Sequence, residues 1–522
     1  MVRHLSPPVI LLFVACGGSG GSPPPPTARF TFDITNAIVA VPQGGSTVAP
    51  VRLTRWTGFD GPVTIAATGP AGLTADKLTI AARETAGTLV LHAAASVALA
   101  PASLNLVATD SDGASLSGTL RVAVIKPGLI DPAFAGGAGL SQVMSTHAVG
   151  FRTNVPLVLM EQPDGKLVVA GTSYDFFAGP AVLIRLLDDG RVDAAFGAGG
   201  MVQLPGVGGE AHAVAIQADG KYVVGGSVHK PGETGAFVEG AVWRVNADGT
   251  MDAGFGAGGV ATFFVPQNAA AATAIQLDVD GHVRVAGTAN YPHADVFTAR
   301  LDSAGQLDQA YGSGGLASHS LSQSAASDPI AADDGGWWIP GTSVDGDHRH
   351  PIVVRLDATG ALVSDFGTDG VATMAPELAG YDRFLPVPGG FVAVGVSSQG
   401  TESATLVSRF DADGRLDEGF GDHGHMLLPR VFAPGMAVLG DGRLLGGYVL
   451  LDGSRWDVGL ARLSSAGALD PTFGDAGDFR ISWFGVDVDP NTTVLLWARS
   501  DDSVVVCFDN PATLSWNVFH LN

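Results

Sequence analysis

The chain has 522 residues, more than one ordinary domain holds, so two or more domains are expected. Its 51 acidic residues outnumber 28 basic ones, and the formal net charge of -23 disfavours binding to nucleic acid or to anionic lipid headgroups. Hydrophobic residues make up 46% of the chain beside 72 Gly and 31 Pro, a composition that favours packed cores of short strands and turns over helices.

The first 16 residues, MVRHLSPPVILLFVAC, have the pattern of an export signal, with Arg3 ahead of an apolar run and small residues before Cys16. The segment FVAC resembles the lipobox of bacterial lipoproteins, although Phe13 stands where these usually have Leu. The resemblance implies removal of residues 1–15, lipidation of Cys16 and membrane attachment through that anchor. Gly17 after the cysteine favours the outer membrane or the cell surface. An ordinary secretory signal with a chance cysteine is the alternative.

Residues 16–28 continue as GGSGGSPPPPTA after the cysteine. Gly and Ser make a chain flexible, whereas consecutive prolines extend and stiffen it. This segment is predicted to be a tether that holds a folded body away from a membrane.

Residues 29–126 alternate apolar and polar residues in short runs such as STVAPVRLTR, TLVLHAA and GTLRVAVI, separated by Gly and Pro turns. The pattern predicts an antiparallel β-sandwich. The segment GFDGPVTIAATGPAGLTA (58–75) resembles the Ig-like modules of bacterial surface proteins, which implies a spacer or a binding platform. The Cys–Trp–Cys pattern of antibody domains is missing, so a disulfide-free relative is expected.

Residues 127–522 carry one segment seven times, in forms such as RVDAAFGAGGMV, TMDAGFGAGGVA and ALDPTFGDAGDF. The repeats lie 53 to 62 residues apart and are centred on the aromatic residues Phe134, Phe196, Phe255, Tyr311, Phe366, Phe420 and Phe473. A fixed period of this length indicates a repeat architecture.

Two further patterns recur within the period. One is a turn followed by an apolar strand, as in QPDGKLVVAG, and the other is a strand with an Arg before its end, as in VLIRLLDDG. About four antiparallel strands per period predict one blade of a β-propeller, so the fold class is all-β, an Ig-like sandwich followed by a seven-bladed propeller of four-stranded blades. Segments such as ALDPTFGDAG and FTARLDSAG resemble the delta-60 repeat family of bacteria, which implies a propeller over residues 127–522.

The seventh blade is expected to be degenerate, with Cys507 of VVVCFDNPATL where the other blades have Arg. The last residues, LSWNVFHLN, are expected to close the ring against the first blade.

The repeated charges are interpreted as structural, because a functional site needs one convergent group and these recur around the ring. Each Arg is expected to hydrogen-bond the Asp or the carbonyl groups that start the next blade. The residues are Arg185, Arg244, Arg300, Arg355, Arg409 and Arg462, with Asp131, Asp193, Asp252, Asp308, Asp417 and Asp470, where the fourth Arg faces Val363 instead of Asp.

Sequences of the type DADGRLDE (411–418) approximate a calcium loop, but only the turn is shared by the other copies, so a turn is predicted and a calcium site stays the alternative. The pairs His348/His350 and His423/His425 have spacing suited to metal ligands but no third ligand nearby, so solvated loops are predicted. Trp337 and Trp338 are predicted to pack within a blade, with a sugar-stacking surface as the alternative.

No sequence pattern here matches a known catalytic motif, so no catalytic residue, cofactor or metal is assigned. The polar residues that depart from the repeat form the candidate ligand rim: Asp345, Asp347, His348, Glu418, Asp422, His423 and His425. The sequence thus predicts an exported, lipid-anchored and monomeric scaffold that binds a protein or a polysaccharide. A carbohydrate-active or other hydrolytic propeller enzyme, with its site around the central channel, is the alternative.

Overall fold

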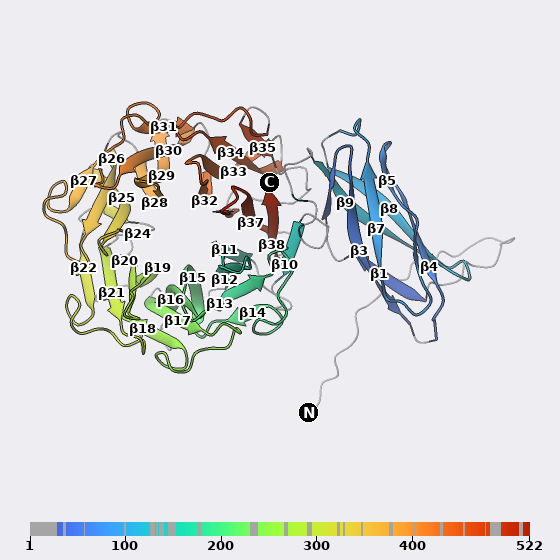
Figure 1. Cartoon of the computed structure of the whole chain (residues 1–522), viewed down its shortest axis with the longest axis horizontal. Helices are drawn as coiled ribbons and strands as arrows, with labels where there is room; N and C mark the ends of the chain where they lie inside the picture. Colours follow the sequence, from blue (N-terminus) through green and yellow to red (C-terminus); the bar gives the residue numbers. More distant parts are fainter. Residues whose placement is uncertain are drawn as a thin grey trace, which may run out of the picture.

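The computed structural model describes residues 29–34, 38–56, 58–98, 101–125, 131, 134, 140–144, 153–174, 179–229, 238–265, 270–289, 295–320, 324–326, 329–345, 348–374, 379–399, 402–428, 432–452, 455–474, 477–480, 492–510 and 515–521. Over these residues the protein is all-β: two sheets stand together at the N-terminal side, and the others form a ring (Figure 1).

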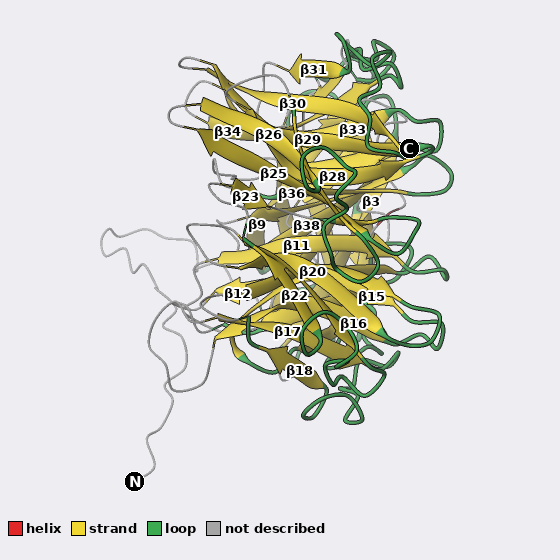
Figure 2. Ribbon diagram, turned by 90° about the vertical axis from the view of Figure 1, so that its left-hand side faces the viewer, coloured by secondary structure: helices red, strands yellow, loops and turns green. Residues whose placement is uncertain are grey.

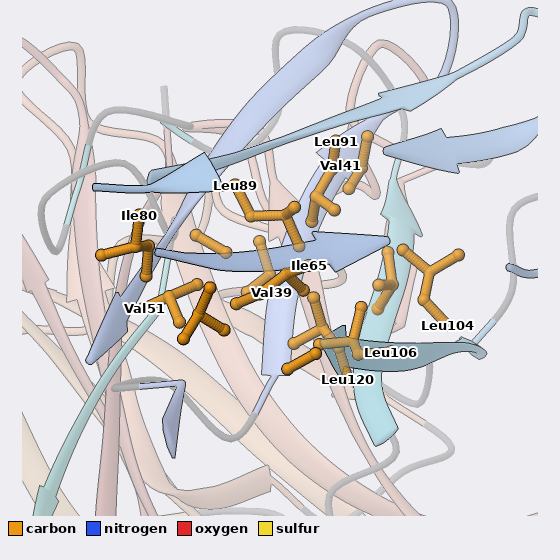
Figure 3. Close-up of a cluster of buried hydrophobic side chains, with 14 of the residues drawn as sticks. Val39, Val41, Val51, Ile65, Ile80, Leu89, Leu91, Leu104, Leu106 and Leu120 are labelled. Atoms are coloured by element: carbon orange, nitrogen blue, oxygen red, sulfur yellow. The ribbon is translucent and has the colours of Figure 1, made fainter. Parts of the chain in front are cut away.

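The N-terminal unit is a sandwich of two sheets, ordered β1-β3-β7-β5 and β2-β9-β8-β4-β6. Its strands are β1 (Phe30–Ile34), β2 (Ile38–Pro42), β3 (Ser46–Arg55), β4 (Val63–Thr68), β5 (Leu73–Ala75), β6 (Leu78–Ile80), β7 (Ala86–Ala93), β8 (Pro101–Asp110) and β9 (Ser115–Ile125). In strands such as β3 alternate residues are buried, as the alternating sequence predicts, whereas Val39, Ala40 and Val41 of β2 are all buried. The expectation of a wholly antiparallel sandwich is wrong at one pair, because β2 runs parallel to β9. Val39, Val51, Ile65, Leu89 and Leu106 meet in the core between the sheets (Figure 3).

The described strands that follow form seven sheets arranged around a ring (Figure 1). They are β10 (Leu140–Met144), β11 (Thr153–Glu161), β12 (Leu167–Tyr174), β13 (Ala181–Leu186), β14 (Met201–Gln203), β15 (Val207–Ile216), β16 (Tyr222–His229), β17 (Val238–Val245), β18 (Val260–Phe263), β19 (Ala270–Leu277), β20 (Val283–Ala289), β21 (Asp295–Leu301), β22 (Leu316–His319), β23 (Ser324–Ala326), β24 (Ile330–Ala331), β25 (Trp337–Asp345), β26 (His348–Leu356), β27 (Val371–Thr373), β28 (Ala379–Val387), β29 (Gly390–Gln399), β30 (Glu402–Asp411), β31 (His425–Leu428), β32 (Phe432–Val438), β33 (Leu444–Asp452), β34 (Arg455–Leu463), β35 (Asp478–Arg480), β36 (Val494–Ala498), β37 (Val504–Asn510) and β38 (Ser515–Leu521).

Most of these sheets follow chain order from the centre of the ring outward, as in β15-β16-β17-β18, with antiparallel pairing throughout. The middle strands are buried on both faces because each sheet packs against two neighbours. In β13, for example, all six residues are buried. Figure 2 shows the ring from the side, with the strands crossing its thickness and the described loops gathered along one face.

The ring closes by pairing the two ends of the repeat region. β10 is hydrogen-bonded to β38, and the sheet has the order β10-β38-β37-β36. The expectation that the last residues of the chain close the ring is thus confirmed. Its outermost strand comes from the start of the region and its other three from the end.

The expectation that Cys507 stands at the position of the repeat Arg is wrong. Cys507 lies in β37, the second strand of its sheet, where it is fully buried and burial raises the pKa of its thiol. The repeat Arg belongs to the third strand: Arg185 pairs with Val168 in the register, and in the closing sheet His520 pairs with Val505. His520 therefore occupies the Arg position. Its Nδ1 lies 3.3 Å from Asp131 Oδ2 and its Nε2 lies 2.7 Å from Ser503 Oγ.

Neighbouring sheets of the ring are joined at the repeated aromatic residue. Phe134, Phe196, Phe255 and Phe420 are buried against a glycine of the next sheet's turn, namely Gly190, Gly249, Gly305 and Gly467. These glycines have φ between 79° and 89°, and a Cβ atom on any of them would lie within 3.0 Å of the ring or the adjacent backbone. The turn needs glycine for its left-handed backbone and also for the close approach of the aromatic ring.

The sandwich contacts the ring beside its closing sheet. Ala40 of β2 is completely buried in a cluster that includes Leu445, Phe479 and Phe508 of the ring. In Figure 1, the sandwich accordingly stands next to β35 and β38.

Replacing a joint glycine tests this packing. In Gly249→Ala, the new methyl carbon would lie 2.3 Å from Gly197 N and 3.0 Å from the Phe196 ring, so we expect a loss of about 2 kcal/mol in the free energy of unfolding. Gly258→Ala is the matched control, because its φ of +67° is similar but nothing lies within 4 Å. We expect about 1 kcal/mol there, from backbone strain alone. The free energy of unfolding of both variants would be measured by denaturant unfolding. If Gly249→Ala and Gly258→Ala lose the same amount, the close packing of Phe196 on Gly249 does not contribute to stability.

Candidate functional site

A repeated set of polar contacts accompanies the aromatic joint. Arg185 Nε donates to Asp193 Oδ2 at 2.9 Å, and Arg185 Nη1 donates to the Ala247 carbonyl of the next sheet at 2.7 Å. The guanidinium lies 4.3 Å from the centre of the Phe196 ring. Arg244 repeats all three contacts with Asp252, Ser303 and Phe255. These contacts confirm a structural role for the Arg and Asp residues. The expected place of the Asp is wrong, because Asp193 lies between β13 and β14 of the same sheet and only the carbonyl belongs to the next one.

Over the described residues, the Arg contacts of the joint are missing between the β23–β27 sheet and the β28–β31 sheet, and we call this junction the broken joint. Its aromatic contact remains, because Phe366 still lies against the turn glycine Gly414. The Asp of the repeat is replaced there by Val363, and Arg355 turns to a different set of partners. Its Nη2 pairs with Asp334, and its guanidinium lies 4.5 Å from the centre of the Trp338 ring. Among the described residues, no hydrogen bond joins Arg355 to the Ala412 carbonyl, which is the position of Ala247 in the intact joint.

A second bond between sheets is also missing at this junction. In three intact joints the amide that follows the aromatic residue donates to the next turn, as Gly197 N does to the Asp248 carbonyl at 2.8 Å. Gly367 N makes no corresponding bond to Asp413 within the described part of the chain. The preceding junction also lacks both bonds, but Arg284 donates there to the Gly335 carbonyl and His319 Nε2 lies 2.7 Å from the Gly360 carbonyl.

A pocket of about 640 Å³ occupies the broken joint. Trp338, Phe366 and Phe391 form its aromatic wall, and Pro386 and Val387 extend the apolar surface. Its polar residues are Arg355, Arg415, Asp333, Asp334, Asp365 and Asp413. Since the turns at 333–334, 389–390 and 412–415 all line it, the pocket opens at the end of the sheets where those turns lie.

The residues that distinguish this copy of the repeat converge on the pocket. Asp333 stands where other copies have Pro163, Ala218 or Val279, and Asp365 stands where they have Ala195, Gly254 or Ala310. Trp338 replaces a Val, Leu or Arg. Together with Val363, four departures from the repeat thus surround one cavity.

The charges of the pocket are only partly paired. Asp334 is bound by Arg355, and Arg415 Nη1 pairs with Asp413. Burial opposes ionisation of Asp334, but the hydrogen bonds from Arg355 and Gly336 outweigh it and lower the pKa of Asp334. Asp333 and Asp365 are both exposed, and no ion pair or hydrogen bond to either carboxylate is found within the described residues.

The structure places the rim residues predicted from sequence at opposite ends of the strands. Asp345 and His348 face each other in the register at the far end of the β25–β26 hairpin from the pocket. Glu418, Asp422 and His423 are exposed beyond β30, at the end where the turn 412–415 lies. Asp347 and Cys16 lie outside the described residues.

His425 is part of an internal network and does not share a site with His423. It lies in β31 opposite Ser408 of β30, and its Nδ1 is 2.7 Å from Ser408 Oγ. Tyr381 Oη also donates to Ser408 Oγ, at 2.8 Å. Burial lowers the pKa of the His425 imidazole, against a smaller opposing effect of Asp422.

The calcium-like sequence at 411–418 forms a turn. Asp411 Oδ1 accepts hydrogen bonds from the backbone amides of Asp413 and Arg415, at 2.9 and 2.8 Å, and Gly414 has a φ of +76°. Asp411 is thus occupied by its own turn. The described residues include no group of three metal-ligating side chains and no helix suited to crossing a membrane.

Sequence reasoning did not find the pocket, although two of its signals were visible. Val363 stood out as the exception among the repeated Asp residues, and the Trp337–Trp338 pair stood out among aliphatic strands. Asp333 and Asp365 gave no signal on their own. Asp333 lies in the turn before β25 and Asp365 lies in the segment after β26, and the sequence does not show that these two segments line the same pocket.

The family model described as "Domain of unknown function (DUF5122) beta-propeller" matches residues 162–196, 217–255 and 439–473. Each match runs from the turn before the second strand to the repeated Phe, so it covers the residues that build the joint. Together with the ring of antiparallel sheets, the match shows that the chain contains a β-propeller. No curated protein matches the chain in sequence.

Solved structures resemble the chain only distantly. A protein of unknown function from Dyadobacter fermentans is 12% identical, with a TM-score of 0.38, and covers 74% of this chain and 99% of its own. An endo-arabinase from Bacteroides thetaiotaomicron is 10% identical, with a TM-score of 0.26, over 47% of this chain and 91% of its own. A β-fructofuranosidase from Bombyx mori is 10% identical, with a TM-score of 0.26, over 75% and 92%. Scores this low carry no argument about function.

The His425 network predicts a pH dependence of stability. Because the folded protein lowers the pKa of His425 below the value of 6.5 for a free imidazole, the unfolded chain binds the proton more readily. Stability from this group is therefore full above about pH 6.5 and is lost as the pH falls through the folded pKa. We expect the thermal unfolding temperature of the native protein to fall more steeply in that range than that of His425→Gln. Parallel curves would contradict this role.

Proposed function

We propose that the protein is an exported binding scaffold. In this proposal the seven sheets are the blades of a closed propeller of the delta-60 type, the sandwich is an Ig-like spacer, and the pocket between the β23–β27 and β28–β31 sheets is the ligand site. The broken joint is the observation that carries the proposal.

The broken joint supports a ligand site because it lacks, in the part of the chain that the structure describes, polar contacts that the Arg185 and Arg244 joints make. An intact joint has a buried Arg–Asp pair and hydrogen bonds to the next sheet, whereas this one has a cavity with exposed carboxylates. Cavities and unmade bonds between packed elements reduce stability. Four residues around this cavity differ from the other copies of the repeat. Such a cluster of differences is what we expect of a surface adapted to a ligand.

Export and anchoring rest on the N-terminal sequence. The lipobox-like FVAC and the following Gly/Ser/Pro tether support attachment through Cys16 to the outer membrane or the cell surface. More than one acyl chain on that cysteine would anchor the protein stably. The net charge of -23 argues against attachment by attraction to anionic lipids.

The pocket can be tested by restoring the repeat. We expect Val363→Asp to draw the Arg355 guanidinium away from Asp334, as in the Arg185–Asp193 pair, and to reshape the pocket. Cell-wall and extracellular oligosaccharides, peptides and polyamines would be screened by calorimetry. For any compound that binds, we expect Val363→Asp to weaken binding about tenfold, a difference of roughly 1.4 kcal/mol.

Val363→Thr is the matched control, because it keeps the size of the side chain and adds no carboxylate. Circular dichroism would show whether Val363→Asp keeps its fold. If the folded variant binds as tightly as the native protein, the pocket is not the ligand site. Chromatography of the screened compounds tests the alternative function, since the appearance of cleaved products would replace the scaffold with a hydrolase.

Lipid anchoring is tested at Cys16. We expect the native protein to fractionate with membranes and Cys16→Ala to be released into the soluble fraction. Labelling with a radioactive fatty acid should follow the same pattern. If Cys16→Ala stays with the membrane fraction, the thiol is not the anchor.

A further inference from the structure

We propose that the pocket binds a cationic group, a guanidinium or a primary ammonium on an aliphatic stem. This inference rests on the proposed function and specifies the chemistry of its ligand. It follows from the charge of the pocket and from the group that the same environment holds at the intact joints of this protein.

The charge of the pocket is the first step. Four carboxylates and two guanidinium groups line it. Asp334 and Asp413 are engaged by Arg355 and Arg415, which leaves Asp333 and Asp365 without a cationic partner among the described residues. Both of these Asp residues occupy positions that carry no acid in the other copies of the repeat. A ligand that meets them is favoured by positive charge and disfavoured by negative charge.

The Arg185, Arg244 and Arg462 joints show how this protein holds a guanidinium between two sheets. At these three joints a guanidinium lies over the repeated Phe, at 4.3 Å for Arg185 on Phe196, 4.6 Å for Arg244 on Phe255 and 4.7 Å for Arg462 on Phe473. A cation over an aromatic face is attracted by the negative charge of the ring. At the broken joint Arg355 instead lies over Trp338, and Trp338 packs edge-on against Phe366 with 5.2 Å between the ring centres. Both aromatic residues line the pocket.

One acceptor of the missing guanidinium, the turn carbonyl, also remains in place. Ala247 and Ser303 accept from the Arg residues of the intact joints, whereas the corresponding residue Ala412 lines the pocket and receives no such bond. A cation in the pocket would therefore have carboxylates, the aromatic wall and the Ala412 backbone around it, the three kinds of group that Arg185 contacts within the chain.

The apolar residues of the pocket indicate what the uncharged part of the ligand is. Pro386, Val387 and Phe391 offer an apolar surface beside the charged part, and a volume of about 640 Å³ exceeds that of a single side chain. A compact inorganic cation would leave this surface uncovered. The arrangement suits an organic cation whose aliphatic part packs against these residues.

Calorimetric titration of the whole protein with matched probes tests the inference. Agmatine and cadaverine supply the two cations on aliphatic stems, and N-acetylcadaverine and diacetylcadaverine remove one or both charges. Chitosan and chitin pentasaccharides carry amines or acetamides on the same sugar backbone. We expect agmatine, cadaverine or chitosan to bind, their acetylated counterparts to bind at least fivefold more weakly, and binding to weaken with salt.

The variant Asp333→Asn/Asp365→Asn should weaken binding of the cationic probes roughly two- to tenfold, since each exposed ion pair contributes modestly. Asp33→Asn/Asp369→Asn is the matched control: it removes the same charge from exposed positions outside the pocket and should leave binding unchanged. Equal loss in both variants would show attraction to the net charge alone and would overturn the inference.

The outcomes separate this inference from the proposed function. If acetylated probes or chitin bind as tightly as the amines, and Val363→Asp still weakens them, the pocket is a ligand site but its cation preference is wrong. If cationic probes bind equally to native protein, Val363→Asp and Asp333→Asn/Asp365→Asn, both the pocket and the inference fail. The absence of binding by any cationic probe overturns the inference, and the wider screen then decides the proposed function.

Discussion

The contact between one sheet and the next is the interaction on which the ring depends. An aromatic ring at the end of one sheet packs against a turn glycine of the next, and an Arg beside it bridges an Asp and a backbone carbonyl across the same junction. The glycine is required because any side chain would displace the aromatic ring or the neighbouring backbone. The Arg is nearly buried and is retained at low cost because each of its partners is in place.

The closing sheet shows how the same joint works when its parts come from both ends of the chain. Asp131 and Phe134 precede the first complete sheet in sequence, whereas the residue that meets them, His520, stands almost at the other end. His520 is too short to reach the next turn as Arg185 does. Arg499 contributes there instead, donating to the Asp188 carbonyl at 3.3 Å. The closing joint therefore keeps the geometry of the repeat with different side chains, and it unites residues that lie 389 positions apart.

The pocket lies at a joint where the repeat Arg has changed its partners. Where Val363 replaces the Asp, Arg355 pairs with Asp334 and lies over Trp338. Among the described residues the two hydrogen bonds to the next sheet are absent, while Phe366 still packs against Gly414. The preceding junction, as far as the structure describes it, also lacks these hydrogen bonds, so aromatic packing and other contacts hold neighbouring sheets together where the bonds are absent. In a repeated architecture one junction can differ from the others while the shared contacts hold the ring together.

The sequence by itself determined the all-β class, the seven repeats and the structural role of their Arg and Asp residues, because each of these depends on local periodicity. Turns such as DADG could likewise be predicted, since Asp411 bonds amides only two and four residues away. Only the tertiary structure decided that β10 pairs with β38, that His520 takes the place of Arg, and that Asp333 and Asp365 line one pocket. Those relations join residues distant in sequence, and their geometry is set by how neighbouring sheets pack.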